Sequence, residues 1–259
     1  MRPTAIVTGA SSGVGAATAE ALARDGYDVI LNFRSDADGA ARTRSACEAA
    51  GAVAVTVRGD VADPQTAIDL KAAAIEKGGP LRVLVNNAGM TKHVSHADLD
   101  GLDQDDFARI YAVNVTGAFL TVQALRGLLD QGAEGFDTPS TIVNVASIAG
   151  VLGNGSSIAY AASKGALITM TRSLARALAP RIRVNAVSPG FIDTPWFTKG
   201  LGAETHESIR EQVRAGMPLK TAMTPEQVAA SIASVCATPF AYMTGENIVI
   251  DAGLQLLHP

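Results

Sequence analysis

Tyr160 and Lys164 are the pair of side chains in this sequence whose types and spacing point most directly to chemistry. Residues four apart lie on one face of a helix, so the lysine ammonium is expected close to the phenol. A nearby positive charge favours the tyrosinate and lowers a pKa that is ordinarily about 10. A phenol adjusted in this way can act as an acid or a base near neutral pH.

A glycine-rich segment near the N-terminus, residues 8–15, has the sequence T-G-A-S-S-G-V-G. Its first glycine permits a tight turn, the next lets backbone approach a pyrophosphate, and the last lets a helix pack on a strand. Phosphate would then lie at a helix N-terminus, where free N–H groups and the helix dipole favour negative charge. The sequence therefore predicts a dinucleotide site formed by Gly9, Ser11, Ser12, Gly13, Val14 and Gly15. A dinucleotide site together with a proton donor implies hydride transfer.

The elements that must position these groups alternate between short apolar strands and longer helices. Strands are predicted over residues 4–8, 28–33, 52–57, 82–85, 141–145, 183–187 and 248–250, and helices over 13–25, 37–50, 64–77, 103–130 and 157–179. Alternation of this kind predicts an α/β fold, in which one doubly wound (Rossmann) parallel sheet of about seven strands carries helices on both faces. The strands are continuously apolar, as expected when both faces are covered. We expect one domain over residues 1–259, with an irregular substrate loop over 193–217 that holds a short helix around 204–215.

These motifs together resemble the short-chain dehydrogenase/reductase family over nearly the whole chain, in particular its 3-oxoacyl-acyl-carrier-protein reductases. The resemblance implies that the Ser147 hydroxyl binds the reacting oxygen of the substrate and that Tyr160 exchanges a proton with it. Lys164 would lower the pKa of Tyr160 and bind the nicotinamide ribose. Asn114, in the run Y-A-V-N-V-T-G, matches the family's fourth catalytic position, which helps to hold a water leading from the lysine to solvent. A buried hydrogen bond that only ties two helices together is the alternative for Asn114.

Several positions after successive strands match the cofactor contacts of that family, and parallel strands bind ligands at their carboxyl ends. The matching residues are Asp60 and Val61 for the adenine, Asn87, Ala88 and Gly89 beside the ribose, and Pro189, Gly190, Ile192 and Thr194 for the carboxamide.

The end of the second strand carries Arg34 and Ser35 in place of a carboxylate, and Arg34 can form charge-assisted hydrogen bonds to a 2′-phosphate. This favours NADP(H) over NAD(H), although relatives with a similar N-x-R-S segment include enzymes that accept both. A solvated loop arginine is the alternative.

The composition limits the classes of partner. With 21 basic and 25 acidic residues and no basic run, nucleic acid is not expected. No secretion signal and no uninterrupted apolar run of about 20 residues is found, so we expect a cytoplasmic protein that does not span a membrane. Cys47 and Cys236 are expected to be buried thiols. His93 and His96 lack further ligands nearby in sequence, so no metal is expected.

The sequence leaves the substrate open. Apolar residues that follow the catalytic segments favour a mainly nonpolar carbonyl or alcohol compound, either of the 3-oxoacyl type or a sugar-alcohol type. The residues free to shape the pocket are Val151, Leu152, Asn154, Pro195, Trp196, Phe197, Leu201 and Met217. The resemblance implies a homotetramer packed through the two long helices. A nucleotide-binding regulator that has lost the chemistry is the competing hypothesis, and the complete set of catalytic positions argues against it.

Overall fold

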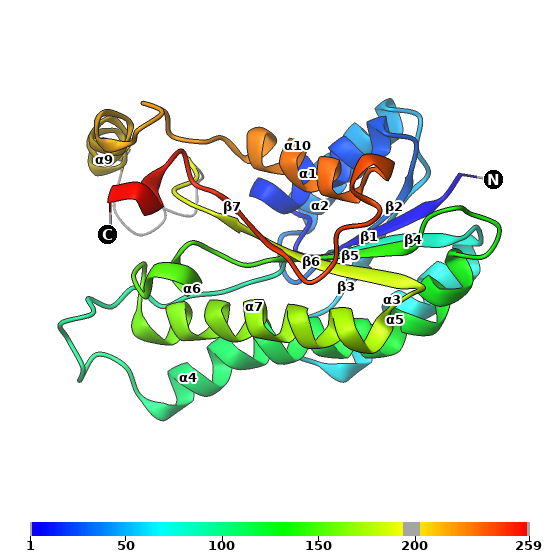
Figure 1. The fold of residues 1–259 in the computed structure, drawn as a ribbon, viewed down its shortest axis with the longest axis horizontal. Coiled ribbons are helices and arrows are strands. Elements are labelled where there is room, and N and C mark those ends of the chain that lie inside the picture. The colour runs from blue at the N-terminus through cyan, green and yellow to red at the C-terminus, as the bar shows by residue number, and fades with distance from the viewer. Residues whose placement is uncertain (1, 194–202, 258–259) are drawn as a thin grey trace.

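The protein folds around one seven-stranded parallel sheet with the strand order β3-β2-β1-β4-β5-β6-β7 (Figure 1). The computed structural model describes residues 2–193 and 203–257. The strands are β1 Thr4–Val7, β2 Asp28–Phe33, β3 Ala54–Arg58, β4 Leu81–Asn86, β5 Ser140–Val145, β6 Ile182–Pro189 and β7 Asn247–Ile250. The expected doubly wound sheet of seven strands is confirmed, and its strand order reverses between β1 and β4, where such folds bind their ligands.

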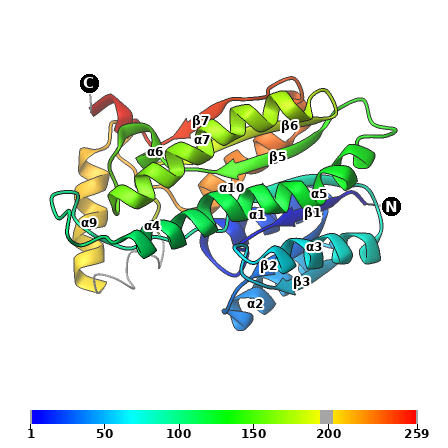
Figure 2. The ribbon, with the colours of Figure 1, turned by 90° about the horizontal axis from the view of Figure 1, so that it is seen from below.

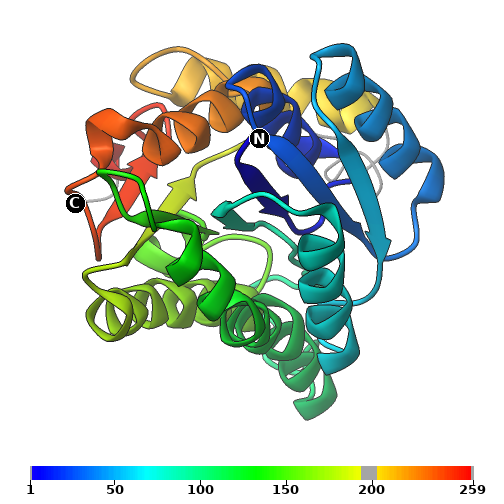
Figure 3. The same ribbon diagram turned by 90° about the vertical axis from the view of Figure 1, so that its right-hand side faces the viewer.

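Helices cover both faces of the sheet, as Figures 1 and 3 show. The longer helices are α1 Gly13–Arg24, α2 Ala37–Ala49, α3 Pro64–Lys77, α4 Gln104–Tyr111, α5 Ala118–Gly132, α7 Ile158–Leu178, α9 Ala203–Gly216 and α10 Pro225–Cys236. Short helical turns are η1 Ala112–Gly117, α6 Ala149–Leu152, η2 Thr238–Phe240 and η3 Leu254–Leu257. Helices α1, α2 and α10 lie on one face, and α3, α5 and α7 lie on the other (Figures 1 and 2).

The central strands are buried from end to end because each face meets a helical layer. Val7, Val85 and Val143 contact the core beneath α1 and α10. Ile6 and Ile142, whose side chains alternate with those, belong to the core beneath α3, α5 and α7. Continuous apolar strands therefore reflect two separate cores, one on each side of the sheet.

Local signals explain where several helices begin. The Asp63 carboxylate accepts a hydrogen bond from the backbone N–H of Gln65, and Pro64 occupies the first helical position of α3. Helix α10 was not predicted from the sequence, although Thr224 and Gln227 form a capping box before it. That local pattern is the signal that could have revealed α10.

The long helix expected over residues 103–130 is interrupted by a π-helical turn at η1. Within this turn the Asn114 amide bonds to the backbone of Met90, and Gly117 packs against Val61. A Cβ atom at Gly117 would lie 2.8 Å from the Val61 carbonyl oxygen. These non-local contacts hold a wider turn than a regular helix allows, and π turns of this kind are frequent at functional sites.

The same stretch, Gln104–Gly132, has the length and hydropathy of a membrane span, which differs from the expectation that no segment would. In the structure it packs within the domain, where α5 contacts α3, β4 and β5 (Figure 2). Core helices of water-soluble proteins commonly have this composition.

Candidate active site

Ser147, Tyr160 and Lys164 come together at the carboxyl end of β5. Ser147 follows that strand, and its hydroxyl accepts a hydrogen bond from the backbone N–H of Ala149 at 3.1 Å, which begins α6. Tyr160 lies in the first turn of α7, where its backbone N–H donates to the Ser157 hydroxyl at 3.3 Å. Burial raises the pKa of the Tyr160 phenol, and Ser147 is the hydrogen-bonding neighbour that lowers it in part. Ser147 and the start of α7 therefore lie at the same carboxyl edge of the sheet.

Lys164 lies one helical turn beyond Tyr160 and is 4% exposed. Its Nζ atom donates to the carbonyl oxygen of Val145 at 2.8 Å and lies 5.7 Å from the centroid of the Tyr160 ring. The expected placement of the lysine on the tyrosine's side of the helix is therefore found.

The direction of the Tyr160 pKa differs from the expectation drawn from the sequence. Desolvation by burial raises the pKa of Tyr160, and the hydrogen bond with Ser147 opposes this only in part. The same desolvation lowers the pKa of Lys164 to about 8. The Lys164 ammonium is directed at a backbone carbonyl, and burial outweighs any effect of its charge on the phenol.

Asn114 is 1% exposed and uses its whole amide in hydrogen bonds. Its Oδ1 atom accepts from the Met90 N–H at 2.8 Å, and its Nδ2 atom donates to the Met90 carbonyl at 3.0 Å and to the Ser163 hydroxyl at 2.9 Å. The Ser163 hydroxyl in turn donates to the Tyr160 carbonyl oxygen at 2.7 Å. Asn114 thus ties η1 to the segment after β4 and, through Ser163, to the helix that carries Tyr160. Ser163 has no motif that would have marked it in the sequence.

The glycine-rich turn meets the segment after β4 at close range. A Cβ atom at Gly15 would lie 2.3 Å from the Gly9 carbonyl oxygen and 2.4 Å from Asn87 Nδ2. Thr8 Oγ1 accepts hydrogen bonds from the backbone N–H groups of Asn87 and Ala88, both at 3.0 Å. Thr8 therefore links two of the expected cofactor segments.

The N-terminus of α1 is free to bind an anion. Ser12 precedes the helix in an extended conformation, its side chain makes no capping hydrogen bond, and the first turn contains no acidic residue. Gly9 and Gly13 take left-handed φ angles of 64° and 56°, which only glycine adopts readily. Exposed N–H groups at a glycine turn fit the pyrophosphate of a dinucleotide.

Two arginines stand where the ribose phosphate is expected. Arg34 Nη1 lies 3.6 Å from Asp60 Oδ2, and both side chains are partly exposed. Arg58, which pairs with Phe33 across β2 and β3, donates from Nε to the Arg34 carbonyl oxygen at 3.3 Å. No motif in the sequence marks Arg58, because its approach to Arg34 is set by strand register and not by distance along the chain. Ser35 lies beside Arg34 at the exposed start of the loop before α2.

Asp60 and Val61, the residues expected at the adenine, differ in their exposure. The Asp60 carboxylate accepts from the Ala62 N–H at 3.0 Å and is partly exposed. Val61 is 6% exposed and its backbone faces Gly117. Both the side chain and the carbonyl group of Val61 therefore pack against η1.

The segment after β6 closes the site next to Ser147. The Ile148 N–H donates to the Pro189 carbonyl at 2.9 Å, and the Gly190 N–H donates to the Ile250 carbonyl at 2.8 Å. Ile192 forms an isolated parallel bridge with Met223. Thr194 and the expected pocket residues Pro195, Trp196, Phe197 and Leu201 lie outside the described residues.

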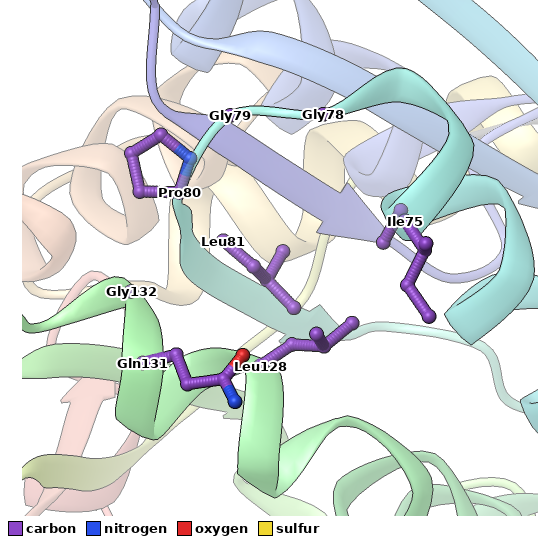
Figure 4. Close-up of a pocket in the computed structure, with 9 residues that line it drawn as sticks. Ile75, Gly78, Gly79, Pro80, Leu81, Leu128, Gln131 and Gly132 are labelled. Atoms are coloured by element: carbon purple, nitrogen blue, oxygen red, sulfur yellow. The ribbon is translucent and has the colours of Figure 1, made fainter.

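The expected pocket residues that the structure describes differ in how far they are buried. Val151 is 45% exposed on α6, and Leu152 and Asn154 are partly buried nearby. Met217 is buried at 7% exposure just after α9, so it does not present an open surface. A hollow of about 570 Å³ lies far from these groups, between the C-terminal ends of α3 and α5 (Figure 4). Ile75, Pro80 and Leu128 line that hollow, which contains no acid–base group and is not the candidate site.

Comparisons with known proteins agree with this arrangement. The family described as Enoyl-(Acyl carrier protein) reductase matches residues 9–255. Ketoacyl reductase 2 of granaticin polyketide synthase from Streptomyces violaceoruber is 38% identical over 98% of this chain and 97% of its own. L-rhamnose 1-dehydrogenase (NAD(P)(+)) from a Sphingomonas strain is 37% identical over 98% and 96%. A crystal structure of a short-chain dehydrogenase/reductase from Burkholderia xenovorans matches with a TM-score of 0.90 at 34% identity, covering 98% of each chain. Sequence, fold and site together establish that the chain belongs to the short-chain dehydrogenase/reductase family of NAD(P)-dependent oxidoreductases.

Proposed function

We propose that this protein transfers hydride between NADP(H) and a ketone or secondary alcohol, with Tyr160 as the acid and base. The observation that carries the proposal is the placement of buried Lys164 one helical turn from Tyr160, with its Nζ atom 5.7 Å from the centroid of the Tyr160 ring. A relative named as a ketoacyl reductase supports a 3-oxoacyl-type substrate. Another relative is named as a dehydrogenase of L-rhamnose, which supports a sugar-alcohol type of substrate as the second candidate.

The roles of the chain's own residues follow from their positions. The Ser147 hydroxyl binds the substrate oxygen, and Tyr160 donates its proton to that oxygen in reduction or removes it in oxidation. Burial raises the pKa of Tyr160, so the phenol holds its proton at neutral pH in the form that reduction requires. Lys164 stabilises the tyrosinate that remains and binds the nicotinamide ribose. When bound, the nicotinamide supplies or accepts the hydride.

Asn114 acts as a positioning residue in this proposal. Its amide fixes Met90 and Ser163, and Ser163 holds the backbone of Tyr160. A Cβ atom at Gly89 would lie 3.4 Å from Asn114 Oδ1 and 3.5 Å from Lys164 Nζ, so both side chains border one small space. We place in this space the water that would lead protons from Lys164 to solvent.

The cofactor would lie along the carboxyl edge of the sheet. The turn from Gly9 to Gly15 would hold the pyrophosphate, and Asn87, Ala88 and Gly89 would line the ribose. The remaining contacts that we propose are Asp60 and Val61 at the adenine, and Pro189, Gly190, Ile192 and Thr194 at the carboxamide. Arg34, Ser35 and Arg58 would hold the 2′-phosphate, which is the basis for the NADP(H) preference. In that state Arg34 would give up its ion pair with Asp60 for the phosphate.

We further propose that the chain works as one domain in the cytoplasm and assembles into a homotetramer. In support of assembly, Phe107 is 37% exposed on α4 and Phe119 is 42% exposed on α5. Leu256 and Leu257 are exposed after β7. Large apolar side chains exposed in groups commonly mark contacts between subunits. Sedimentation of a monomer would contradict the tetramer.

Replacing Tyr160 by phenylalanine tests the proposed chemistry. We expect turnover to fall by at least ~10²-fold, because the proton donor is lost, while NADPH binding measured by fluorescence titration is kept. The control is Tyr242→Phe, which removes the same hydroxyl from a side chain that is 95% exposed. Turnover would be followed by the absorbance of NADPH with a panel of oxoacyl thioesters, sugars, steroids and diketones. Unchanged turnover in Tyr160→Phe would remove Tyr160 from the reaction.

A further inference from the structure

Two arginines are buried at the edge of the sheet opposite to the active site. Arg82 is the second residue of β4 and is 8% exposed, and Arg183 is the second residue of β6 and is 3% exposed. Thr141 of β5 lies between these strands and pairs with both Val83 and Arg183. The strand pairing of β4 with β1 shifts register around Arg82, and such irregularities redirect a side chain. The chain therefore places two permanent positive charges in one small region.

Neither arginine forms an ion pair within the part of the chain that is described. Arg82 donates to the Gly132 carbonyl at 3.2 Å and to the Thr138 carbonyl and hydroxyl at 2.9 and 2.8 Å. Arg183 donates from Nη2 to the Val235 carbonyl. Arg183 Nη1 is buried and has no hydrogen-bond partner among the described residues. A buried donor of a charged group that lacks a partner is strongly unfavourable.

The Tyr27 phenol and the Cys236 thiol, which line the same region as the arginines, do not supply a negative charge. Burial raises the pKa of the Tyr27 phenol and raises that of the Cys236 thiol to about 12, so both groups are neutral at physiological pH. Burial also lowers the pKa of both guanidinium groups, which reflects the unfavourable desolvation of their charges. The Asp25 carboxylate acts on both Tyr27 and Cys236, but it is exposed at the end of α1 and screened by solvent, so the buried groups keep an excess of positive charge.

Two helix ends compensate part of that charge. Gly132 is the last residue of α5, and Val235 lies in the last turn of α10, so the carbonyl groups that bind the arginines belong to helix C-termini. Each helix C-terminus acts as roughly half a negative charge. Two guanidinium charges against two such ends leave about one positive charge uncompensated.

A small polar cavity adjoins these groups. Its volume is about 40 Å³, and it is lined by Tyr27, Arg82, Thr138, Thr141, Arg183 and Cys236 among others. One particle of the size of water needs ~10–15 Å³ of such space. The cavity therefore has room for one small ion together with water.

We propose that this cavity binds one chloride-sized monovalent anion, held by Arg183 Nη1 and by the charge of Arg82. The anion completes the charge balance of the two arginines and gives the unpartnered donor an acceptor. It would join β4, β6 and the C-terminus of α10 at a place about six residues, or ~20 Å, along β5 from Ser147. We expect its effect on stability to be larger than its effect on catalysis.

Thermal unfolding of the purified protein tests the site. Sodium gluconate is replaced by sodium chloride at constant ionic strength, so that only the identity of the anion changes. Binding to the native state should raise the Tm by roughly 3–6 °C once chloride reaches about ten times its Kd. An equal Tm in both salts would overturn the proposal.

A matched pair of variants locates the effect. Arg82→Gln should remove most of the rise in Tm produced by chloride, because one of the two charges is lost. Arg42→Gln makes the same change on an exposed part of α2 and should keep the full response. Should Arg82→Gln fail to fold, crystals of the unmodified protein soaked in sodium bromide decide the question through anomalous scattering. A bromide peak beside Arg183 Nη1 supports the site, and its absence there refutes it.

Discussion

Lys164→Met is expected to make the protein more stable and inactive at the same time. Desolvation lowers the pKa of Lys164 from 10.5 to about 8, a difference of about 2.5 pH units. Each unit corresponds to about 1.4 kcal/mol, so burial of the charged ammonium destabilises the native state by about 3 kcal/mol at neutral pH. Methionine fills similar space without a charge. It leaves the Val145 carbonyl without its donor, which costs about 1–3 kcal/mol at every pH.

The pH dependence separates these two effects. Below about pH 8 the lysine is protonated in both the native and the unfolded state, and the full penalty is present. Between about pH 8 and 10.5 the unfolded state binds more protons, so the stability of the unmodified protein rises relative to the variant. Urea unfolding of both proteins across this range should show a relative gain of about 3 kcal/mol.

Comparison of the two proteins cancels the titration of the groups that they share. Lys71→Met on α3 serves as the control for exchanging an exposed lysine for methionine at alkaline pH. A difference in unfolding free energy that stays constant from neutral pH to about pH 10.5 would refute the idea that Lys164 is held charged against its desolvation.

The other predictions concern the cofactor and the support of the site. Arg34→Ala should weaken NADPH binding by roughly 10- to 150-fold and NADH binding much less, and equal losses in fluorescence titrations would exclude Arg34 from the phosphate site. Arg58→Ala should show the same selectivity, which a role confined to its backbone contact with Arg34 would not produce. Gly15→Ala should abolish binding of both cofactors because its Cβ would meet backbone at 2.3 Å, whereas Gly127→Ala, with nothing within 4 Å, should bind normally in the same titrations. Asn114→Ala should lower the free energy of unfolding by about 2–5 kcal/mol in urea, because buried groups lose their partners, and a smaller loss would mean that the surroundings relax.

The fold and the outline of the site could be predicted because their signals are local. Apolar runs reveal strands such as β4 and β5 directly, and residues that follow successive parallel strands must meet at one edge. Ser147 could be placed from this rule alone, and the i, i+4 spacing placed Lys164 beside Tyr160.

Features that depend on contacts between distant segments could not be predicted. The π turn at η1 depends on Met90 and Val61, and the approach of Arg58 to Arg34 depends on strand register. The Tyr160 pKa was expected to fall because only the charge of Lys164 was visible in the sequence, whereas the degree of burial appears only in the folded chain. Helix α10 differs from these cases, because the capping pattern at Thr224 that marks its start is a local signal in the sequence.

The π turn between α4 and α5 accommodates one residue more than a regular helical turn does. Regular α-helical hydrogen bonds across Ala112–Gly117, with no residue removed, would eliminate the extra width of this turn. The residues that follow would then rotate by about 100° around the helix axis. Leu125 and Leu129, now fully buried against the sheet, would turn away from it. Deleting one residue from the π turn would cancel that rotation, so, for the packing of α5, a one-residue deletion should be tolerated better within Ala112–Gly117 than in the regular helix that follows.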